Sequence, residues 1–291
     1  MSAARFNTTL ATRQAVDIRS HRKPSATARR QELELKLTDL QQHYAELRSE
    51  MFEAAQVHRR LCAPRQLRFG NFEVASEIFA VRHLPGDFFT VQQQFDGVVF
   101  ALGDICGKGL AAGMWTTHLV GLVSAYTAET AEPEAIVTAL NRDLCRMSSV
   151  VPLTSLFLAR LDPATGRLDY SNAGHPPPML LCADRHLEWL SEGGPLLGAI
   201  PAASYKSGHV DLRAGDVVLA YTDGILESRN SAAEEFGSDR LEVQLRHSPT
   251  SSAQAVLFSM LGAVQDFAAT SPLTDDTSLV VVRRGTGEDH T

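Results

Sequence analysis

Five aspartates lie beside glycines or at the ends of apolar segments, where a carboxylate can be held in a fixed position. They are Asp87, Asp104, Asp223 and the adjacent pair Asp275 and Asp276. Carboxylates collected at one end of a sheet repel one another unless cations neutralise them. Mg²⁺ and Mn²⁺ prefer oxygen ligands, and two such ions about 4 Å apart can activate water and hold a phosphoryl group. The set therefore predicts a centre for divalent cations, although each Asp alone is explained as a turn residue.

Three apolar segments would position these carboxylates. Residues 98–102 form a continuous apolar run that leads into Asp104, and residues 217–221 lead into Asp223. Residues 279–282 follow the Asp275-Asp276 pair. Runs of this length without alternation are typical of strands buried on both faces. We therefore expect three interior strands, each with acidic residues at one end.

Helices and turns separate these strands. The sequence predicts helices over residues 110–128 and 133–146, and a further helix that reaches Phe267 from a capping box at Ser251 and Gln254. Met114 and Trp115 are expected in the core. A turn at residues 162–166 predicts a hairpin between strands 155–161 and 168–171. Because strands come in runs and do not alternate strictly with helices, the predicted class is α+β with mainly antiparallel sheet.

Residues 1–30 have a different composition from the rest of the chain. They carry seven basic side chains and one acidic side chain, with sparse apolar residues in no regular period. Such a segment cannot bury enough apolar surface to fold alone, so we expect a disordered basic tail. Its Arg, Ser and scarcity of acidic residues also resemble a transit peptide. Residues 285–291 are expected to form a second short tail.

A heptad pattern follows over residues 31–63, and Pro64 should end the helix. The apolar positions alternate at spacings of four and three residues: Leu33, Leu37, Leu40, Tyr44, Leu47, Met51 and Ala54. This narrow stripe is typical of a two-stranded coiled coil, which would make the protein a homodimer or dock a regulatory partner through residues 33–61. A single amphipathic helix packed on its own domain is the alternative.

Composition limits the function classes. The chain has 291 residues, of which 44% are hydrophobic and 21% charged, values ordinary for a globular protein. The sequence contains no apolar run of about 18 residues, so it predicts no membrane-spanning helix. The net charge of −7 argues against general nucleic-acid binding. Four separate cysteines without a CxxC pair (Cys62, Cys106, Cys145 and Cys182) indicate reduced thiols in the cytoplasm, not a disulfide framework or zinc site.

Five ordered blocks give the chain a family resemblance. Between about Phe72 and Arg284 it resembles the metal-dependent protein Ser/Thr phosphatases of the 2C type (the PPM superfamily), in the branch of the bacterial sporulation stage II E proteins. Each block alone is weak, whereas five in order over some 200 residues are specific. The blocks are Leu-Pro-Gly-Asp-Phe-Phe (84–89), Gly-Asp-Ile-Cys-Gly-Lys-Gly (103–109), Asn-Ala-Gly-His-Pro-Pro (172–177), Gly-Asp through Tyr-Thr-Asp-Gly to Glu (215–227) and Asp-Asp-Thr-Ser-Leu (275–279).

The resemblance implies a fold and a chemistry. The domain at residues 66–284 would be a four-layer αββα sandwich of two antiparallel sheets. Asp87, Asp104 and Asp223 would bind two Mg²⁺ or Mn²⁺ ions, with the Ile105 backbone carbonyl and Asp275 completing the sites and Asp276 as the alternative to Asp275. A metal-activated water would hydrolyse a phosphoserine or phosphothreonine protein, in this branch typically a small anti-sigma-factor antagonist of a partner-switching pathway.

Other side chains near the blocks have weaker assignments. Arg82 could contact phosphate or could be a surface residue on a strand. Lys108 could also reach phosphate, but no P-loop motif surrounds it, so it is expected to be a flexible loop residue. His175 could carry protons, but before three prolines it is expected to fix a turn. Cys106 replaces the usual small polar residue of the branch, so no obvious general acid lies there. A non-catalytic metal-stabilised scaffold and a small-molecule phosphatase are the rival functions.

Overall fold

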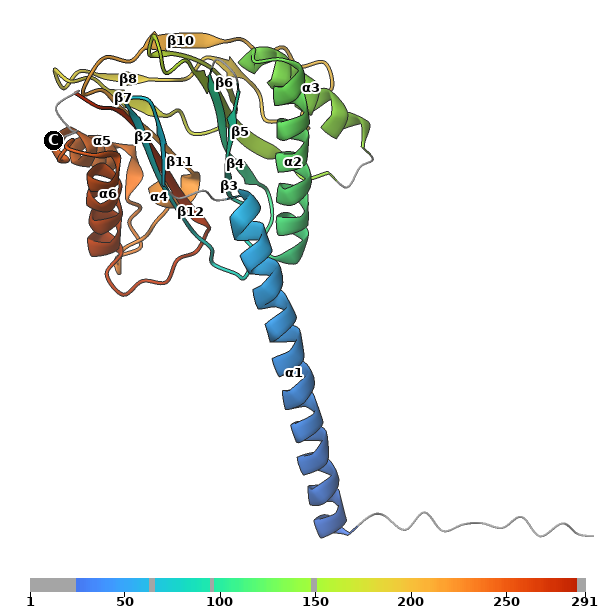
Figure 1. The fold of residues 1–291 in the computed structure, drawn as a ribbon. Coiled ribbons are helices and arrows are strands. Elements are labelled where there is room, and N and C mark those ends of the chain that lie inside the picture. The colour runs from blue at the N-terminus through green and yellow to red at the C-terminus, as the bar shows by residue number, and fades with distance from the viewer. Residues whose placement is uncertain (1–24, 63–65, 95–96, 148–150, 287–291) are drawn as a thin grey trace, which may run out of the picture. The chain divides into compact units, whose positions relative to one another are not determined.

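The computed structural model describes residues 25–62, 66–94, 97–147 and 151–286, and Figure 1 shows the order of its elements. The chain divides into two units, Met1–Ser49 and Glu50–Thr291, which are described separately here. Residues 1–24 of the predicted basic tail and residues 287–291 of the predicted C-terminal tail lie outside the described residues. Pro64 also lies outside them.

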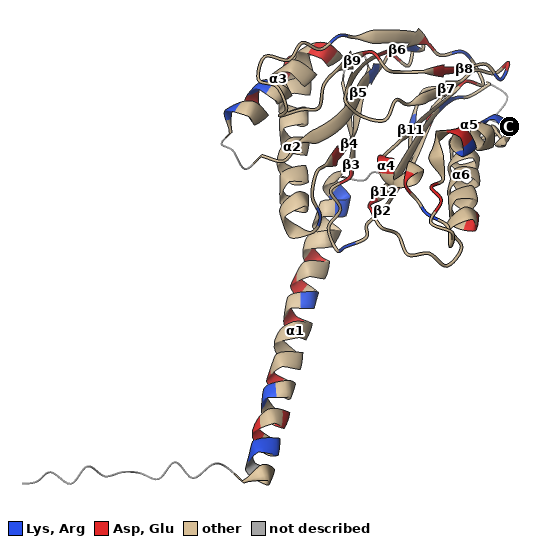
Figure 2. Cartoon of the chain, turned by 180° about the vertical axis from the view of Figure 1, so that it is seen from behind, with Lys and Arg blue, Asp and Glu red and all other residues tan. Residues whose placement is uncertain are grey.

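The first helix, α1, runs over Ala26–Cys62. It begins five residues before the predicted start, so the end of the predicted tail is helical. Arg30 forms an ion pair of 2.8 Å with Glu34 one turn later, which favours helix at this point. Acidic and basic residues are interspersed along α1 (Figure 2). The heptad side chains remain exposed, with Leu33, Leu40 and Leu47 at 59%, 65% and 58%.

The last turns of α1 belong to the second unit. His58 is 5% exposed, and Cys62 is fully buried among apolar side chains that include Leu119 and Val123. Burial lowers the pKa of His58 and raises that of Cys62 to about 12. The helix ends two residues before Pro64, as predicted.

Two sheets form the centre of the second unit (Figure 1). The first has the order β1-β2-β12-β11-β7-β8, built from Gln66–Phe69, Phe72–Phe79, Thr277–Arg284, Val217–Tyr221, Met179–Leu181 and Leu187–Trp189. The second has the order β10-β6-β5-β4-β3, built from Gly208–Asp211, Arg167–Ala173, Thr154–Leu161, Val98–Ile105 and Phe88–Gln93. A short strand, β9 (Gly193–Gly194), pairs in parallel with β6, and the other described pairings are antiparallel.

Helices cover the outer face of each sheet, giving four layers (Figure 1). On β3–β6 lie α2 (Leu110–Glu129) and α3 (Pro133–Arg146). On the other sheet lie α5 (Gly237–His247) and α6 (Ala253–Ala268), and the short α4 (Asp223–Leu226) follows β11. The predicted α+β class and αββα sandwich are confirmed. All three predicted helices of this domain are present within two residues of their expected ends.

The sandwich has one core between the sheets and one under each helix layer. Phe89, Phe100 and Phe157 lie between the sheets, together with Val218 and Val280. Alternate residues of the same strands face the helices. The strands at residues 98–105, 217–221 and 277–284 are therefore apolar on both faces, which explains their uninterrupted hydrophobic sequence.

Two local expectations are wrong. Met114 is 66% exposed because Ala112 and Thr116 occupy the buried face of α2, whereas Trp115 packs partly against the core. The cap of α6 is Ser252 and not Ser251: the Ser252 hydroxyl accepts a hydrogen bond of 3.1 Å from the Ala255 N–H. Within the described ranges, we find no helix that combines the length and hydrophobicity needed to cross a membrane.

Candidate metal centre

Asp104 lies on β4, inside the strand that the apolar run predicts. The strand continues beyond the run to Ile105, and Asp104 is paired in register with Ser155 of β5. Its side chain is half-buried. Burial, followed by the repulsion of Asp223, raises the pKa of Asp104 to about 6. Asp104 is therefore a carboxylate whose charge is opposed by its surroundings.

Asp87 directly precedes β3 and is 1% exposed. Its Oδ2 atom accepts hydrogen bonds from the Thr222 hydroxyl at 2.7 Å and the Ser278 hydroxyl at 2.5 Å. Thr222 also accepts a 3.0 Å hydrogen bond from the Ser278 N–H, so β11 and β12 hold this carboxylate together. Burial and the nearby Asp104 raise the pKa of Asp87 well above its usual value, and the two hydroxyls only partly oppose this shift.

Asp223 is the first residue of α4, directly after Tyr221 and Thr222 at the end of β11. Its side chain is half-buried. Burial raises its pKa, and the carboxylate of Asp275 raises it further, while the Lys108 ammonium partly offsets both effects. The end of β11 thus places a third carboxylate within electrostatic range of Asp104 and Asp275.

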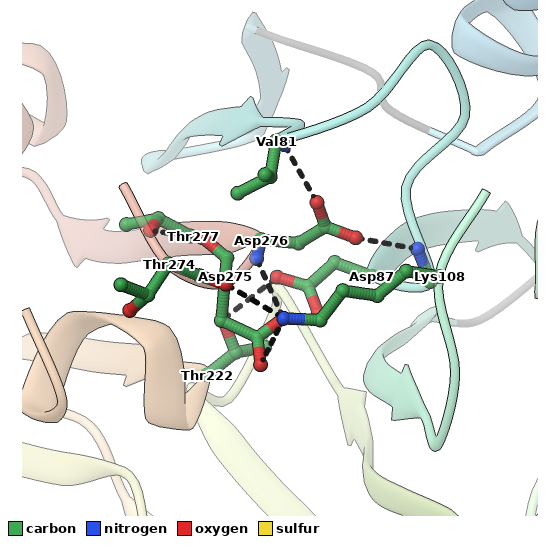
Figure 3. Close-up of polar contacts among 9 residues, drawn as sticks. Val81, Asp87, Lys108, Thr222, Thr274, Asp275, Asp276 and Thr277 are labelled. Carbon is green, nitrogen blue, oxygen red and sulfur yellow. Dashed lines mark hydrogen bonds and ion pairs between the residues drawn. The ribbon is translucent and has the colours of Figure 1, made fainter. Parts of the chain in front are cut away.

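The adjacent Asp276 and Asp275 have different environments (Figure 3). Asp276 is 4% exposed, and its two carboxylate oxygens accept hydrogen bonds from the Val81 N–H at 2.8 Å and the Gly86 N–H at 2.7 Å. These bonds attach the loop between β2 and Asp87 to the start of β12. Asp276 is therefore engaged by the backbone on both oxygens.

Asp275 accepts one local hydrogen bond, from the Asp276 N–H to Oδ1 at 2.8 Å, and has a cationic neighbour. Its Oδ2 atom lies 2.8 Å from Nζ of Lys108, which also donates a hydrogen bond of 2.7 Å to the Thr274 carbonyl. Figure 3 shows Lys108 reaching from its loop to Asp275 and Thr274. The expected flexible loop lysine is thus tied to the acidic cluster. The Asp275 side chain remains 38% exposed.

The Ile105 carbonyl and Arg82 also lie beside these carboxylates. A Cβ atom on Gly86 would come within 2.8 Å of the Ile105 oxygen, so this close approach requires glycine next to Asp87. Arg82 lies in the loop after β2 and not on a strand. Its Cδ and Nη1 atoms would be 3.6 Å from a Cβ atom on Gly109, which places the guanidinium stem beside the Gly107–Gly109 loop.

The five predicted carboxylates are thus brought into one electrostatic cluster at the sheet ends. In the part of the chain that is described, no three His, Cys, Asp or Glu side chains are already arranged as a closed set of metal ligands. The donor chemistry nevertheless fits a hard divalent cation, because the cluster supplies carboxylate oxygens whose pKa values are raised by burial and then by the charges of neighbouring carboxylates. A bound cation would relieve that charge.

His175 lies behind this cluster. It is 3% exposed, its Nδ1 atom is 2.8 Å from the Ser155 hydroxyl, and its backbone N–H donates to the Asn172 side chain at 2.8 Å. Burial lowers the pKa of His175 to about 3, so the ring is neutral near pH 7. The Asn172 side chain also donates to the His175 carbonyl at 3.0 Å. His175 is thus part of a fixed turn, and its low pKa argues against proton transfer.

Three polar residues of the site were missed or misjudged from sequence: Thr222, Ser278 and Lys108. Thr222 and Ser278 occupy two of the five blocks, so their position beside Asp223 and Asp276 was a usable signal. Lys108 also lies in a block, at residues 103–109, but a lysine between two glycines is ordinary in a loop and nothing nearby in the sequence pointed to Asp275. Only the folded chain brings it against Asp275.

Comparisons with known proteins show the family of this chain. The family model of the Stage II sporulation protein E matches residues 95–285. The phosphoserine phosphatase RsbU of Bacillus subtilis is 23% identical over 242 residues, which cover 82% of this chain and 71% of RsbU. Protein IcfG of Synechocystis is 25% identical over 188 residues, covering 55% of this chain. That match spans only 30% of the length of IcfG.

Solved structures share the fold. The PP2C domain of SiaA from Pseudomonas aeruginosa has a TM-score of 0.72 at 17% identity, covering 83% of this chain and 98% of that domain. The RsbU and RsbW domains of a Mycobacterium tuberculosis protein give 0.62 at 21% identity, with coverages of 74% and 60%. The catalytic domain of the Ser/Thr phosphatase PstP, solved with two manganese ions, gives 0.53 at 18%, with coverages of 73% and 97%.

The family match extends over about two thirds of the chain and includes four of the five blocks that the sequence presents. The first block, at residues 84–89, lies just before it and is held to the last block by Asp276. The chain belongs to the Stage II sporulation protein E family, within the PPM-type phosphatase fold.

Proposed function

We propose that the protein is a metal-dependent phosphatase that hydrolyses phosphoserine or phosphothreonine in a protein substrate. The observation that carries this proposal is the convergence of five carboxylates at the sheet ends of a Stage II sporulation protein E fold. Structural carboxylates are usually compensated by cationic or hydrogen-bonding groups. Here burial, followed by repulsion from neighbouring carboxylates, raises the pKa values of Asp87, Asp104 and Asp223, as expected for a site built for cations.

The proposed ligands for two divalent cations are Asp87, Asp104, Asp223, Asp275 and the Ile105 carbonyl. Asp275 is preferred to Asp276 because Asp276 uses both of its oxygens on backbone N–H groups. Oxygen donors select Mg²⁺ or Mn²⁺ over softer metals. The structure of PstP with two manganese ions and that of RsbX with magnesium support the same choice.

The roles of the chain's own residues follow from their contacts. When bound, the cations would activate a water molecule and neutralise charge on the phosphoryl group. Thr222 and Ser278 fix Asp87 through Oδ2, which leaves the orientation of that carboxylate defined. Arg82, beside Gly109, could offer a planar pair of donors to phosphate. Fixed charges of this kind stabilise phosphoryl transfer without a covalent intermediate on the protein.

The proposed substrate is a small phosphorylated anti-sigma-factor antagonist in a partner-switching pathway. The likeness to RsbU and to the RsbU and RsbW domains supports this choice. We place the protein in the cytoplasm, because all four cysteines are free thiols and two of them, Cys145 and Cys182, are partly buried without a disulfide partner. Disulfide-free chains are typical of reducing compartments.

We also propose a homodimer through the heptad stripe of residues 33–61. Leu33, Leu37, Leu40, Tyr44 and Leu47 are each 55–66% exposed, and pairing two helices would bury this stripe at about 25 cal/mol per Å². Sedimentation should show a dimer that becomes a monomer in the double variant Leu40→Asp/Leu47→Asp. Glu46→Gln with Glu50→Gln is the matched surface control. A wild-type monomer at tens of micromolar would contradict the dimer.

One assay separates the proposed function from its rivals. The wild-type chain is given a phosphoserine protein, a phosphoserine peptide and a small phosphate ester, each with Mn²⁺, with Mg²⁺ or with EDTA. We expect phosphate release from the phosphoprotein with metal only. Release from the small ester alone would favour a small-molecule phosphatase, and metal binding without release from any substrate would favour a scaffold. Comparison of phosphoproteomes with wild type and Asp223→Asn would identify the substrate.

A further inference from the structure

Lys108 places a positive charge inside the acidic cluster. Its ammonium lies 2.8 Å from Asp275 Oδ2 and donates to the Thr274 carbonyl at 2.7 Å. It is also close enough to Asp223 to influence that carboxylate electrostatically. The ammonium therefore interacts with two of the carboxylates that are proposed to bind the cations. Like those cations, it carries positive charge.

Lys108 is flanked on both sides by glycines in a backbone conformation that other residues rarely adopt. Lys108 stands between Gly107 at φ +132° and Gly109 at φ +82°, both outside the range that residues with a Cβ atom usually adopt. A Cβ atom on Gly107 would meet nothing within 4 Å, so that position is unpacked. The Lys108 side chain is 32% exposed, so solvent reaches part of it.

We propose that Lys108 is a resident counter-cation that competes with a divalent ion for Asp275 and Asp223. In the absence of metal the ammonium compensates these two carboxylates. Metal binding releases Lys108 from Asp275, and the freed ammonium then lies at the mouth of the site, where a phosphate group would arrive. This inference rests on the proposed metal site and adds a competitor to it.

The ion pair between Lys108 and Asp275 is weak enough for a divalent ion to displace it. Ion pairs with partners this exposed contribute little net stability, because solvent screens them and the lysine side chain loses freedom. A divalent ion has twice the charge and can be held by several oxygens at once. Lys108 should therefore weaken metal binding without preventing it. Replacement of Lys108 by Gln should tighten Mn²⁺ binding about two- to fivefold, the range that such an ion pair supports.

The chain allows a direct test, because it has only four lysines: Lys23, Lys36, Lys108 and Lys206. The full chain, stripped of metal, is acetylated with a limiting amine-reactive reagent, and the rate at each lysine is read by peptide mass spectrometry. The measurement is repeated over a Mn²⁺ titration, and binding is followed separately by calorimetry. We expect the rate at Lys108 to rise severalfold with Mn²⁺ occupancy. Lys206, an exposed residue outside the five blocks, and Lys36, paired with Glu32, should not change.

A matched pair of variants completes the test. Lys108→Gln and Lys206→Gln remove the same charge, and only the first should tighten Mn²⁺ binding. Mn²⁺ binding with an unchanged or slower rate at Lys108 would overturn the competition, even if phosphate release were normal. No Mn²⁺ binding at all would overturn both the competition and the proposed metal site. Equal tightening in both variants would show a general charge effect and would also overturn it.

Discussion

The inner and outer carboxylates of the site differ in what holds them. Asp87 and Asp276 are 1% and 4% exposed, and hydroxyl or backbone N–H groups of the chain itself donate to their oxygens. Asp275 is open to solvent over 38% of its side chain and faces the Lys108 ammonium. Asp223 is half-buried at the start of α4. The inner carboxylates are therefore built into the fold, whereas the outer ones remain partly open to solvent.

Acidic residues in one cluster therefore need not share a role. Asp276 joins the first and last blocks by bonding the loop before Asp87, so its removal should act on the fold. Asp275 is one residue away and makes no such link, so its removal should act on the metal. Asp104 interacts electrostatically with the inner and the outer carboxylates, so its role lies between those of Asp276 and Asp275.

The largest effect should come from Asp104→Asn and Asp223→Asn. Each change keeps the size of the side chain but removes a negative charge that a cation needs. We expect phosphate release to fall by more than about a hundredfold, or about 2.7 kcal/mol in the barrier. The metal-free variants should be as stable as wild type or more stable, because repulsion among the carboxylates is reduced. Phosphate-release assays measure the loss of activity, and thermal unfolding in EDTA measures the stability of the metal-free variants. Wild-type activity in either variant would contradict the assignment of these residues as metal ligands.

Asp276→Ala should separate the inner from the outer carboxylates. It removes an ionised acceptor and leaves the Val81 and Gly86 N–H groups without that partner. We expect the free energy of unfolding to fall by about 2–3 kcal/mol. Asp275→Asn, the matched control at the next residue, should change it by less than about 1 kcal/mol, because it breaks only a partly exposed ion pair. Urea unfolding in EDTA measures both, and equal losses would show that the two carboxylates do not differ as described.

The pH dependence of stability should reveal the buried His175. Its folded pKa of about 3 lies below the ordinary value of 6.5, so the unfolded chain binds more protons between these values. Stability from this residue is therefore present above pH 6.5 and lost as the pH falls. The loss at pH 5 should be about 2 kcal/mol. Carboxylates with raised pKa values act in the opposite direction in the metal-free protein. His175→Gln, compared with wild type at pH 7 and pH 5 in EDTA, isolates the histidine, and equal acid sensitivity would contradict its assignment.

The smallest effect should be that of Cys106→Ser. Cys106 is an exposed residue close to Asp104. Its thiol is partly covered, and this partial burial, followed by the negative charge of Asp104, raises its pKa. It therefore remains a thiol near pH 7 and is a poor nucleophile. We expect activity to be retained. A loss greater than about a hundredfold, about 2.7 kcal/mol, would assign the thiol a catalytic role.

Sequence reasoning worked where a residue's role follows from its neighbours along the chain. The apolar runs located β4, β11 and β12, and hence placed Asp104 and Asp223 at their ends. It could not separate Asp275 from Asp276, because adjacent residues just before a strand have the same local sequence. The partners that distinguish them, Lys108 and the Val81 and Gly86 N–H groups, lie more than 160 residues away.

Exposure was the other property that sequence did not determine. Met114 has the apolar character of a core residue, yet the buried face of α2 is set by contacts with the loop before Asp87, where Thr116 donates to the Gly86 carbonyl at 3.1 Å. The start of α6 depended similarly on which of two adjacent serines takes an extended backbone. Tertiary contacts decided both cases.

The most direct test of the carboxylate centre is a Mn²⁺ titration of the metal-stripped wild-type chain, with bound metal and phosphate release from a phosphoserine protein measured at each point. We predict no release in EDTA, and release that rises in step with occupancy toward two ions per chain. The same titration of Asp104→Asn should give neither tight binding nor release. Full release in EDTA, or release independent of occupancy, would contradict the claim that these carboxylates act through bound cations.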